Sequence, residues 1–110
     1  RSLHVREDGV VAGRVEKQMR FDFVVEENRK MAVKTVDIRD RVRDYMERWA
    51  WRMTDLRNGT PEIVRAMIYN PDEQGWDDTS LAIGREVCNL FCPYYETDRI
   101  SEALERLKAA

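Results

Sequence analysis

The hydrophobic residues of this chain change their spacing near position 39, and this change constrains the fold more than any other feature of the sequence. In residues 19–38 they are largely β-branched or aromatic, and alternation places Phe21, Phe23 and Val25 on one face of a strand. In residues 39–56 they recur every three or four positions, which is typical of a helix with one buried side. The stripe comprises Val42, Tyr45, Met46, Trp49, Ala50, Met53 and Leu56. The spacing therefore predicts β structure followed by a long helix.

One alternative is a single long helix that begins well before position 39. A three-to-four spacing also connects Phe21, Val24, Asn28, Met31, Thr35, Ile38, Val42, Tyr45 and Trp49, as in a coiled-coil seam. Such a helix would leave Phe23, Val25 and Val33 outside the seam, and it would contain many weak helix formers. The strands are therefore favoured.

Turn residues and helix breakers divide the rest of the sequence. Asp8-Gly9 is a type I′ turn signal between the β-compatible residues 2–7 and 10–15, so we expect a hairpin there. Residues 61–69 are rich in branched side chains and are followed by Asn70-Pro71. They predict a buried strand, with a brief helix as the alternative.

Two helices complete the expected order. The first is capped by Asp77 or Asp78 and extends to about Phe91, and the second covers about residues 98–109. The predicted fold class is α+β (mixed α/β). It has three N-terminal antiparallel strands, a long helix, one further strand in a right-handed crossover and two C-terminal helices.

Composition indicates a folded domain without a strong charge bias. The 110 residues, 43% of them hydrophobic and 36% charged, suit one domain, and we interpret the start at Arg1 as a fragment of a larger protein. Lysine and arginine total 19 against 21 acidic residues, and a net charge of −2 argues against a large non-specific nucleic-acid surface. No apolar run reaches the roughly 18 residues that a membrane helix requires, and no signal peptide is recognisable. We therefore expect a cytoplasmic location and no membrane partner.

The metal-ligating residue types are sparse. Cys88 and Cys92 lie four positions apart and are expected on one helix as buried thiols, and His4 is the only histidine. Three such side chains are one short of a closed zinc site. We therefore predict no metal site from these residues.

An aspartate and a lysine follow one another in the β-rich region, before the long helix and the next strand. Asp22 lies in Arg20-Phe21-Asp22-Phe23-Val24 and Lys34 ends Met31-Ala32-Val33-Lys34. Together with the element order over residues 15–92, these residues resemble the PD-(D/E)xK nuclease-like core of restriction enzymes and many phage, repair and defence proteins. The resemblance implies that Asp22 and Lys34 are catalytic, with a divalent metal that activates water for phosphodiester hydrolysis.

The chain departs from this pattern at Ala32, where the family carries a second acid. Metal-assisted hydrolysis usually requires two or more oxygen ligands for Mg²⁺, which Glu16 or Glu26 would have to supply. We therefore expect a nuclease-fold domain without a complete metal site or a cofactor, acting as a binding or assembly module in a bacterial or phage protein. An active Mg²⁺-dependent nuclease with a displaced acid is the alternative. In the simplest interpretation, Asp22 and Lys34 form a cross-strand ion pair.

Two tryptophans lie outside the buried stripes. Trp51 falls about 200° from Trp49 around the long helix, among charged residues that include Arg48. Because Trp and Arg are favoured at interfaces, we expect Trp51 and Arg48 to bind a partner, unless a terminal helix covers Trp51. Trp76, in an acidic loop, is a further binding candidate, although local packing explains it more simply. A third hypothesis is a protein-interaction or oligomerisation domain of unrelated fold. Partners would be another protein or a second copy, with nucleic acid as a further possibility.

Overall fold

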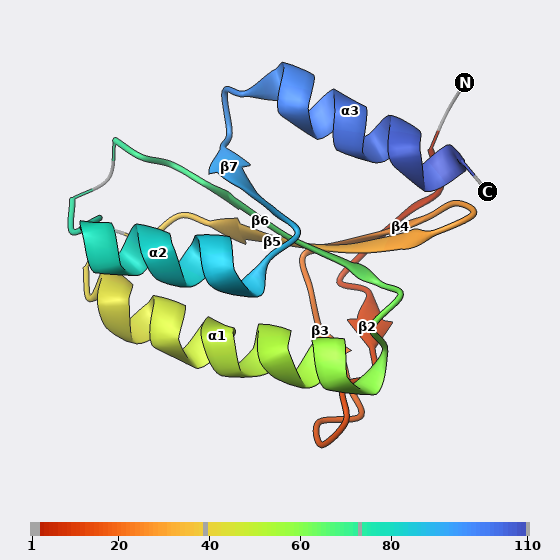
Figure 1. Ribbon diagram of the computed structural model, residues 1–110, viewed down its shortest axis with the longest axis horizontal. Coiled ribbons are helices and arrows are strands. Elements are labelled where there is room, and N and C mark those ends of the chain that lie inside the picture. The colour runs from red at the N-terminus through yellow and green to blue at the C-terminus, as the bar shows by residue number, and fades with distance from the viewer. Residues whose placement is uncertain (1–2, 39, 73, 110) are drawn as a thin grey trace.

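A mixed five-stranded sheet separates helices on its two faces. The computed structural model describes residues 3–38, 40–72 and 74–109. The strand order is β1-β4-β5-β6-β7. The strands are β1 (Val5–Glu7), β4 (Phe23–Glu26), β5 (Lys30–Val36), β6 (Val64–Tyr69) and β7 (Leu90–Pro93). Helices α1 (Val42–Gly59) and α2 (Asp78–Val87) cover one face, and α3 (Thr97–Lys108) covers the other (Figure 1).

The pairing of the strands follows the connections between them. β1 and β4 are antiparallel, as are β4 and β5, whereas β5, β6 and β7 are parallel to one another. Helix α1 connects β5 to β6, and α2 connects β6 to β7. The mixed α/β class and the parallel crossover are confirmed. The single long helix through Phe21 and Trp49 is wrong, because residues 23–26 and 30–36 of that span form strands β4 and β5.

The N-terminal strands differ from the expected hairpin. β2 (Val10–Val11) pairs with β3 (Met19–Arg20) in a separate two-stranded sheet, and β1 pairs with β4. Asp8 has a positive φ of 52°, its amide donates to the Asp22 carbonyl at 2.9 Å, and the Phe21 amide donates to the Gly9 carbonyl at 2.9 Å. Asp8-Gly9 is therefore a bend within one long antiparallel pair, and the prediction of a hairpin turn there is wrong.

The bend also changes which side chains share a face. Phe21 and Val24 are buried in the apolar cluster beneath α1, whereas Val25 is buried in the cluster beneath α3. The expected common face of Phe21, Phe23 and Val25 is wrong, because alternation is interrupted at the bend.

Strand β7 of the main sheet occupies the end of the helix that was expected to run from Asp77 or Asp78 to about Phe91. Helix α2 ends at Val87, and Cys88 is extended, with φ −114° and ψ 147°. The Asn89 side-chain oxygen accepts from the Arg65 amide at 2.9 Å, and the Asn89 amide donates to the Arg65 carbonyl at 2.9 Å. These bonds align β7 with β6, so the prediction of a helix to Phe91 is wrong. The apolar run from Leu90 to Cys92 is too short for its period to distinguish the two structures.

The cysteines consequently do not share a helix. Cys88 follows α2, and Cys92 is buried in β7. Burial raises the pKa of the Cys88 thiol to about 12, and it also raises the pKa of the Cys92 thiol above its usual value. Both thiols are therefore poor nucleophiles at neutral pH.

Two apolar clusters stabilise the two faces of the sheet. Alternation along β5 directs Ala32 and Val36 toward α1 and Met31 toward α3. The larger cluster, on the α1 side, includes Phe21, Val24, Met46, Trp49, Met53, Leu56, Met67 and Phe91. The smaller one, on the α3 side, consists of Val25, Met31, Ala66, Leu90, Cys92 and Leu107. None of the helices in the described part of the chain is long and apolar enough to cross a membrane.

Helix α2 approaches β7 closely at Gly84, where an added Cβ would collide with the Phe91 ring. We expect Gly84→Ala to lower the free energy of unfolding by about 1–3 kcal/mol, because overpacking outweighs the helix propensity of alanine. Urea unfolding measures this difference. Thr79→Ala, at an exposed position of the same helix, is the control and is expected to change stability little. A stabilising Gly84→Ala substitution would contradict the close packing of α2 on β7.

Candidate functional site

Asp22 and Lys34 meet on the face of the sheet that lies beneath α1. Asp22 immediately precedes β4, and Lys34 lies in β5. Because Phe23 pairs with Val33 and the two strands are antiparallel, Asp22 and Lys34 lie opposite each other, one position past that pair. The Lys34 Nζ is 3.4 Å from the Asp22 Oδ1. The other carboxylate oxygen, Oδ2, accepts hydrogen bonds from the amide and the hydroxyl of Thr35, each at 2.8 Å. The structure thus brings the two residues together as a cross-strand ion pair.

The surroundings of the Asp22 carboxylate favour its charged form. Partial burial acts to raise the pKa of Asp22, but the Thr35 hydrogen bonds and the charge of Lys34 together outweigh it, and the pKa lies below its usual value. The carboxylate is therefore ionised at neutral pH, with both oxygens engaged by donors of the protein.

The position of the missing second acid lies in the core. Ala32 is fully buried, pairs with Val24 across the sheet and belongs to the apolar cluster beneath α1. Glu26 lies at the opposite end of β4 from Asp22, roughly 13 Å along the strand, where it forms ion pairs with Arg6 and Lys30. Among the residues that the structure describes, no three His, Cys, Asp or Glu side chains gather as a metal site would require.

Trp49 of α1 connects this ion pair to a surface hollow. The Lys34 Nζ lies 5.1 Å from the centre of the Trp49 ring, and the Arg52 guanidinium lies 5.0 Å from the same ring. Arg48 lies 5.8 Å from the Tyr45 ring, whose centre is 6.4 Å from that of Trp49. Cations over ring faces are attracted by the negative potential of the ring, so these contacts hold the basic side chains against α1.

Burial and the nearby Asp22 raise the pKa of Tyr45 to about 12. The Tyr45 hydroxyl is therefore neutral at physiological pH.

We call the surface depression beside these rings the α1 hollow. It has a volume of about 370 Å³ and is lined by Glu16, Tyr45, Arg48, Trp49, Trp51 and Arg52. Trp51 is 53% exposed. Helix α3 packs on the opposite face of the sheet, so it does not cover Trp51 (Figure 1).

A buried aspartate that the sequence analysis did not single out fixes the loop beside the hollow. Asp55 on α1 accepts from the amides of Val15 and Glu16, each at 2.9 Å, and its carbonyl accepts from Arg14. This arrangement places Glu16 in the α1 hollow and leaves Val15 69% exposed. An added Cβ at Gly13 would collide with the Asp55 carboxylate. A glycine at position 13 is a sequence signal that another group approaches the backbone there, but the sequence does not indicate that this group is Asp55.

Trp76 lies elsewhere, in contact with the aromatic side chains near β6 and β7. Its ring centre is 4.6 Å from that of Tyr69 and 6.2 Å from that of Phe91. Four of the five predicted site residues (Asp22, Lys34, Arg48 and Trp51) therefore lie on the surface around Trp49, and Trp76 contributes to local packing.

Comparison with family models, curated proteins and solved structures finds no match to this chain.

The Asp22 carboxylate gives folding a pH dependence that can be measured. The pKa of Asp22 is lower in the folded state than its unfolded value near 3.8. The carboxylate therefore stabilises the fold fully above pH 3.8, and this stabilisation is lost as the pH falls through the pKa of the folded state. We expect Asp22→Asn to destabilise the protein by about 1 kcal/mol at pH 7 and by progressively less as the pH falls toward 3. Urea unfolding across this range measures the difference. Asp37→Asn, at an exposed position, is the control, and a pH-independent effect of Asp22→Asn would contradict this explanation.

The Asp55 carboxylate is expected to stabilise both the fold and the loop at the hollow. Asp55→Ala would leave two backbone amides without their acceptor, and we expect a loss of about 2–3 kcal/mol in unfolding free energy. Hydrogen exchange of the Val15 and Glu16 amides should accelerate in the same variant. Asp44 lies on the same helix and forms an exposed ion pair with Arg41, the residue before the helix. Asp44→Ala should lower the free energy of unfolding by less than about 1 kcal/mol. Equal costs for the two variants would refute the role of Asp55.

Proposed function

We propose that this chain is a non-catalytic protein-binding domain with a degenerate nuclease-like core, and that it binds its partner through the α1 hollow. The observation that carries the proposal is the exposed Trp51 indole, which lies beside Arg48 and Arg52 at a hollow with a fixed rim.

The engagement of the Asp22 carboxylate supports a non-catalytic role. Its Oδ2 already accepts two hydrogen bonds from Thr35, and its Oδ1 faces Lys34. A metal would have to compete with these donors. Ala32 belongs to the apolar cluster beneath α1, so a carboxylate at that position would be costly to bury.

The composition of the hollow supports binding. Tryptophan and arginine are enriched among the residues that dominate binding free energy at protein interfaces. Arg48 and Arg52 are held against aromatic rings, so they lose less side-chain entropy on binding than free arginines would. Val15, on the loop fixed by Asp55, adds an exposed apolar side chain near this surface.

The same contacts favour a protein over single-stranded nucleic acid. Proteins that bind single strands stack successive bases on free aromatic faces. Here Arg48 lies over Tyr45, and both Lys34 and Arg52 lie over Trp49. Trp51 is the one exposed ring of the hollow's lining. The partner that fits presents a large apolar side chain to Trp51 and a neighbouring carboxylate to the two arginines.

A random peptide library selected on the immobilised chain tests this proposal and reveals which side chains the partner presents. We expect enriched peptides that carry a large apolar residue beside Asp or Glu. Trp51→Ala should weaken their binding by roughly tenfold or more, because truncation of a central interface tryptophan typically costs over 1 kcal/mol. Tyr94→Ala is the matched control, since Tyr94 is also 53% exposed but follows β7. It should leave binding unchanged.

Other outcomes separate the parts of the proposal. Magnesium-dependent cleavage of DNA or RNA that both Asp22→Ala and Lys34→Ala abolish would overturn the non-catalytic assignment. Peptides that bind the Trp51→Ala variant as tightly as the wild type would overturn the assignment of the surface. Oligonucleotide binding that requires Trp51, in the absence of peptide binding, would overturn the choice of a protein partner. A dimer in light scattering that Trp51→Ala converts to a monomer would support the surface and identify the partner as a second copy.

A further inference from the structure

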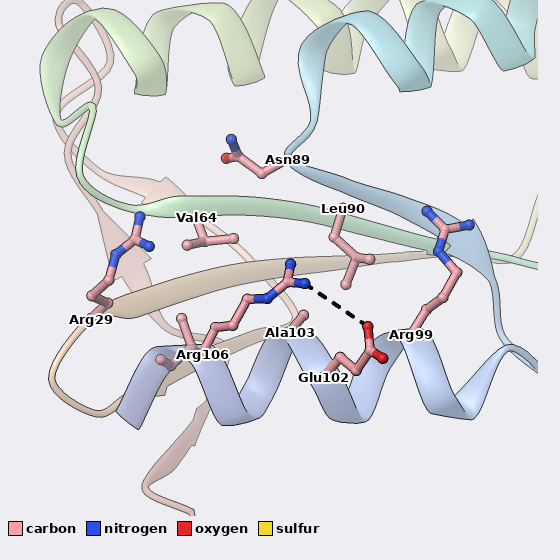
Figure 2. A pocket seen from close by; sticks show the side chains of 9 residues that line it. Arg29, Val64, Asn89, Leu90, Arg99, Glu102, Ala103 and Arg106 are labelled. Carbon is pink, nitrogen blue, oxygen red and sulfur yellow. Dashed lines mark ion pairs between the residues drawn. The ribbon is translucent and has the colours of Figure 1, made fainter. Parts of the chain in front are cut away.

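A second hollow lies on the opposite side of the molecule, between α3 and the first residues of β6 and β7. We call it the α3 groove. It has a volume of about 270 Å³, close to the lower end of the roughly 300–1,000 Å³ typical of small-molecule sites. Its apolar lining comes from Val64 of β6, Leu90 of β7 and Ala103 of α3 (Figure 2).

Three arginines line the α3 groove. Arg29 belongs to the turn between β4 and β5, and Arg99 and Arg106 are two turns apart on α3. Figure 2 shows all three side chains extending from their backbones to the same side of α3, with Arg106 between Arg29 and Arg99. Guanidinium groups present planar pairs of donors that match the oxygens of phosphate and carboxylate groups.

Only part of this positive charge is neutralised by neighbours. Arg99 forms an ion pair with Glu96 at 2.8 Å. Arg106 lies 4.0 Å from Glu102, and both side chains are mostly exposed, so this pair is weak. The Arg29 side chain forms no ion pair with any residue that the structure describes. The lining therefore contains three cations and a single acid, Glu102.

Asn89, which precedes β7, also lines the groove. Its side-chain oxygen accepts from the Arg65 amide at 2.9 Å, and Figure 2 shows its NH₂ group pointing away from α3 and from the three arginines. Two hydrogen bonds attach the Arg29 turn to the end of α3, since the Arg29 amide donates to the Leu107 carbonyl and Asn28 donates to the Lys108 carbonyl. The arginines are thus carried by elements that are attached to one another.

We propose that the α3 groove binds a small phosphate monoester, with the phosphate on Arg29 and Arg106 and an apolar substituent against Val64, Leu90 and Ala103. A monoester phosphate offers three terminal oxygens and up to two negative charges, which suits several donors better than a single carboxylate does. The volume suits a small molecule rather than a folded partner. This site does not depend on the α1 hollow, which lies on the other face of the sheet.

Titration of the whole chain with phenyl phosphate, followed by amide NMR, tests this inference. We expect shifts at Arg29, Asn89, Leu90 and Ala103 and a lower dissociation constant than for inorganic phosphate, because the ring would cover the apolar lining. Benzoate should bind more weakly than phenyl phosphate. No shifts in the groove at millimolar phenyl phosphate, or equal affinity for benzoate, would overturn the proposal.

Variants at Arg29 identify the site. Because the Arg29 side chain forms no ion pair within the described part of the chain, Arg29→Ala should fold normally. It should weaken phenyl phosphate binding roughly tenfold, the equivalent of one charge-assisted hydrogen-bond partner. Arg29→Lys keeps the positive charge and should lower the affinity for phenyl phosphate less than Arg29→Ala does. Arg14→Ala removes an exposed arginine elsewhere and should have no effect. If Arg14→Ala weakens binding as much as Arg29→Ala, the binding is non-specific and the inference fails. Oligonucleotide binding that requires Arg29, without phenyl phosphate binding, would also overturn it.

Discussion

Burial of β5 on both faces is the constraint on which the rest of the structure depends. β5 pairs antiparallel with β4 and parallel with β6, so it joins the N-terminal strands to the crossover units. Its alternating side chains supply both cores, with Ala32 and Val36 beneath α1 and Met31 beneath α3. A shift of one residue in its register would exchange these two sets. The same alternation places Lys34 on the α1 side, where it meets Asp22 and Trp49.

The α1 surface follows from this placement. Lys34, Arg48 and Arg52 each lie over an aromatic ring of α1, and each such contact contributes about 0.5–1 kcal/mol at exposed sites. Asp55 then fixes the neighbouring loop through two backbone amides. Asp22 and Lys34, which resemble catalytic residues in the sequence, thus lie against the aromatic side chains of α1. Trp51 is exposed next to these side chains, and this exposed indole is the basis for proposing a binding role.

The two hollows differ in chemistry as well as in position. The α1 hollow combines aromatic rings with charges of both signs, and its rim includes Glu16. The α3 groove combines hydrogen-bond donors with an apolar lining, and Glu102 is its one acid. The first suits an apolar side chain with a neighbouring carboxylate, and the second suits a compact anion. The sheet separates them, so occupation of one would not block the other.

The sequence by itself determined the elements whose period extends over many residues. The stripe from Val42 to Leu56 predicted α1 and its buried side, and the position of Trp51 off that stripe predicted its separation from the core. The strands around Asp22 and Lys34 were also predictable, because their β-branched residues fit poorly in a helix. Residues 88–93 were not, because a short apolar run has no period that separates a strand from the end of a helix. β7 is aligned by its pairing with β6 and by the contact of Asn89 with Arg65.

Only the tertiary structure decided which distant residues share a surface. Segments far apart in the chain are joined by the bend at Asp8-Gly9, by the hydrogen bonds of Val15 and Glu16 to Asp55, and by the α3 groove, which Arg29 and Arg106 both line. Local spacing carries no information about such contacts, because a backbone amide or a guanidinium is equally compatible with many partners until packing selects one.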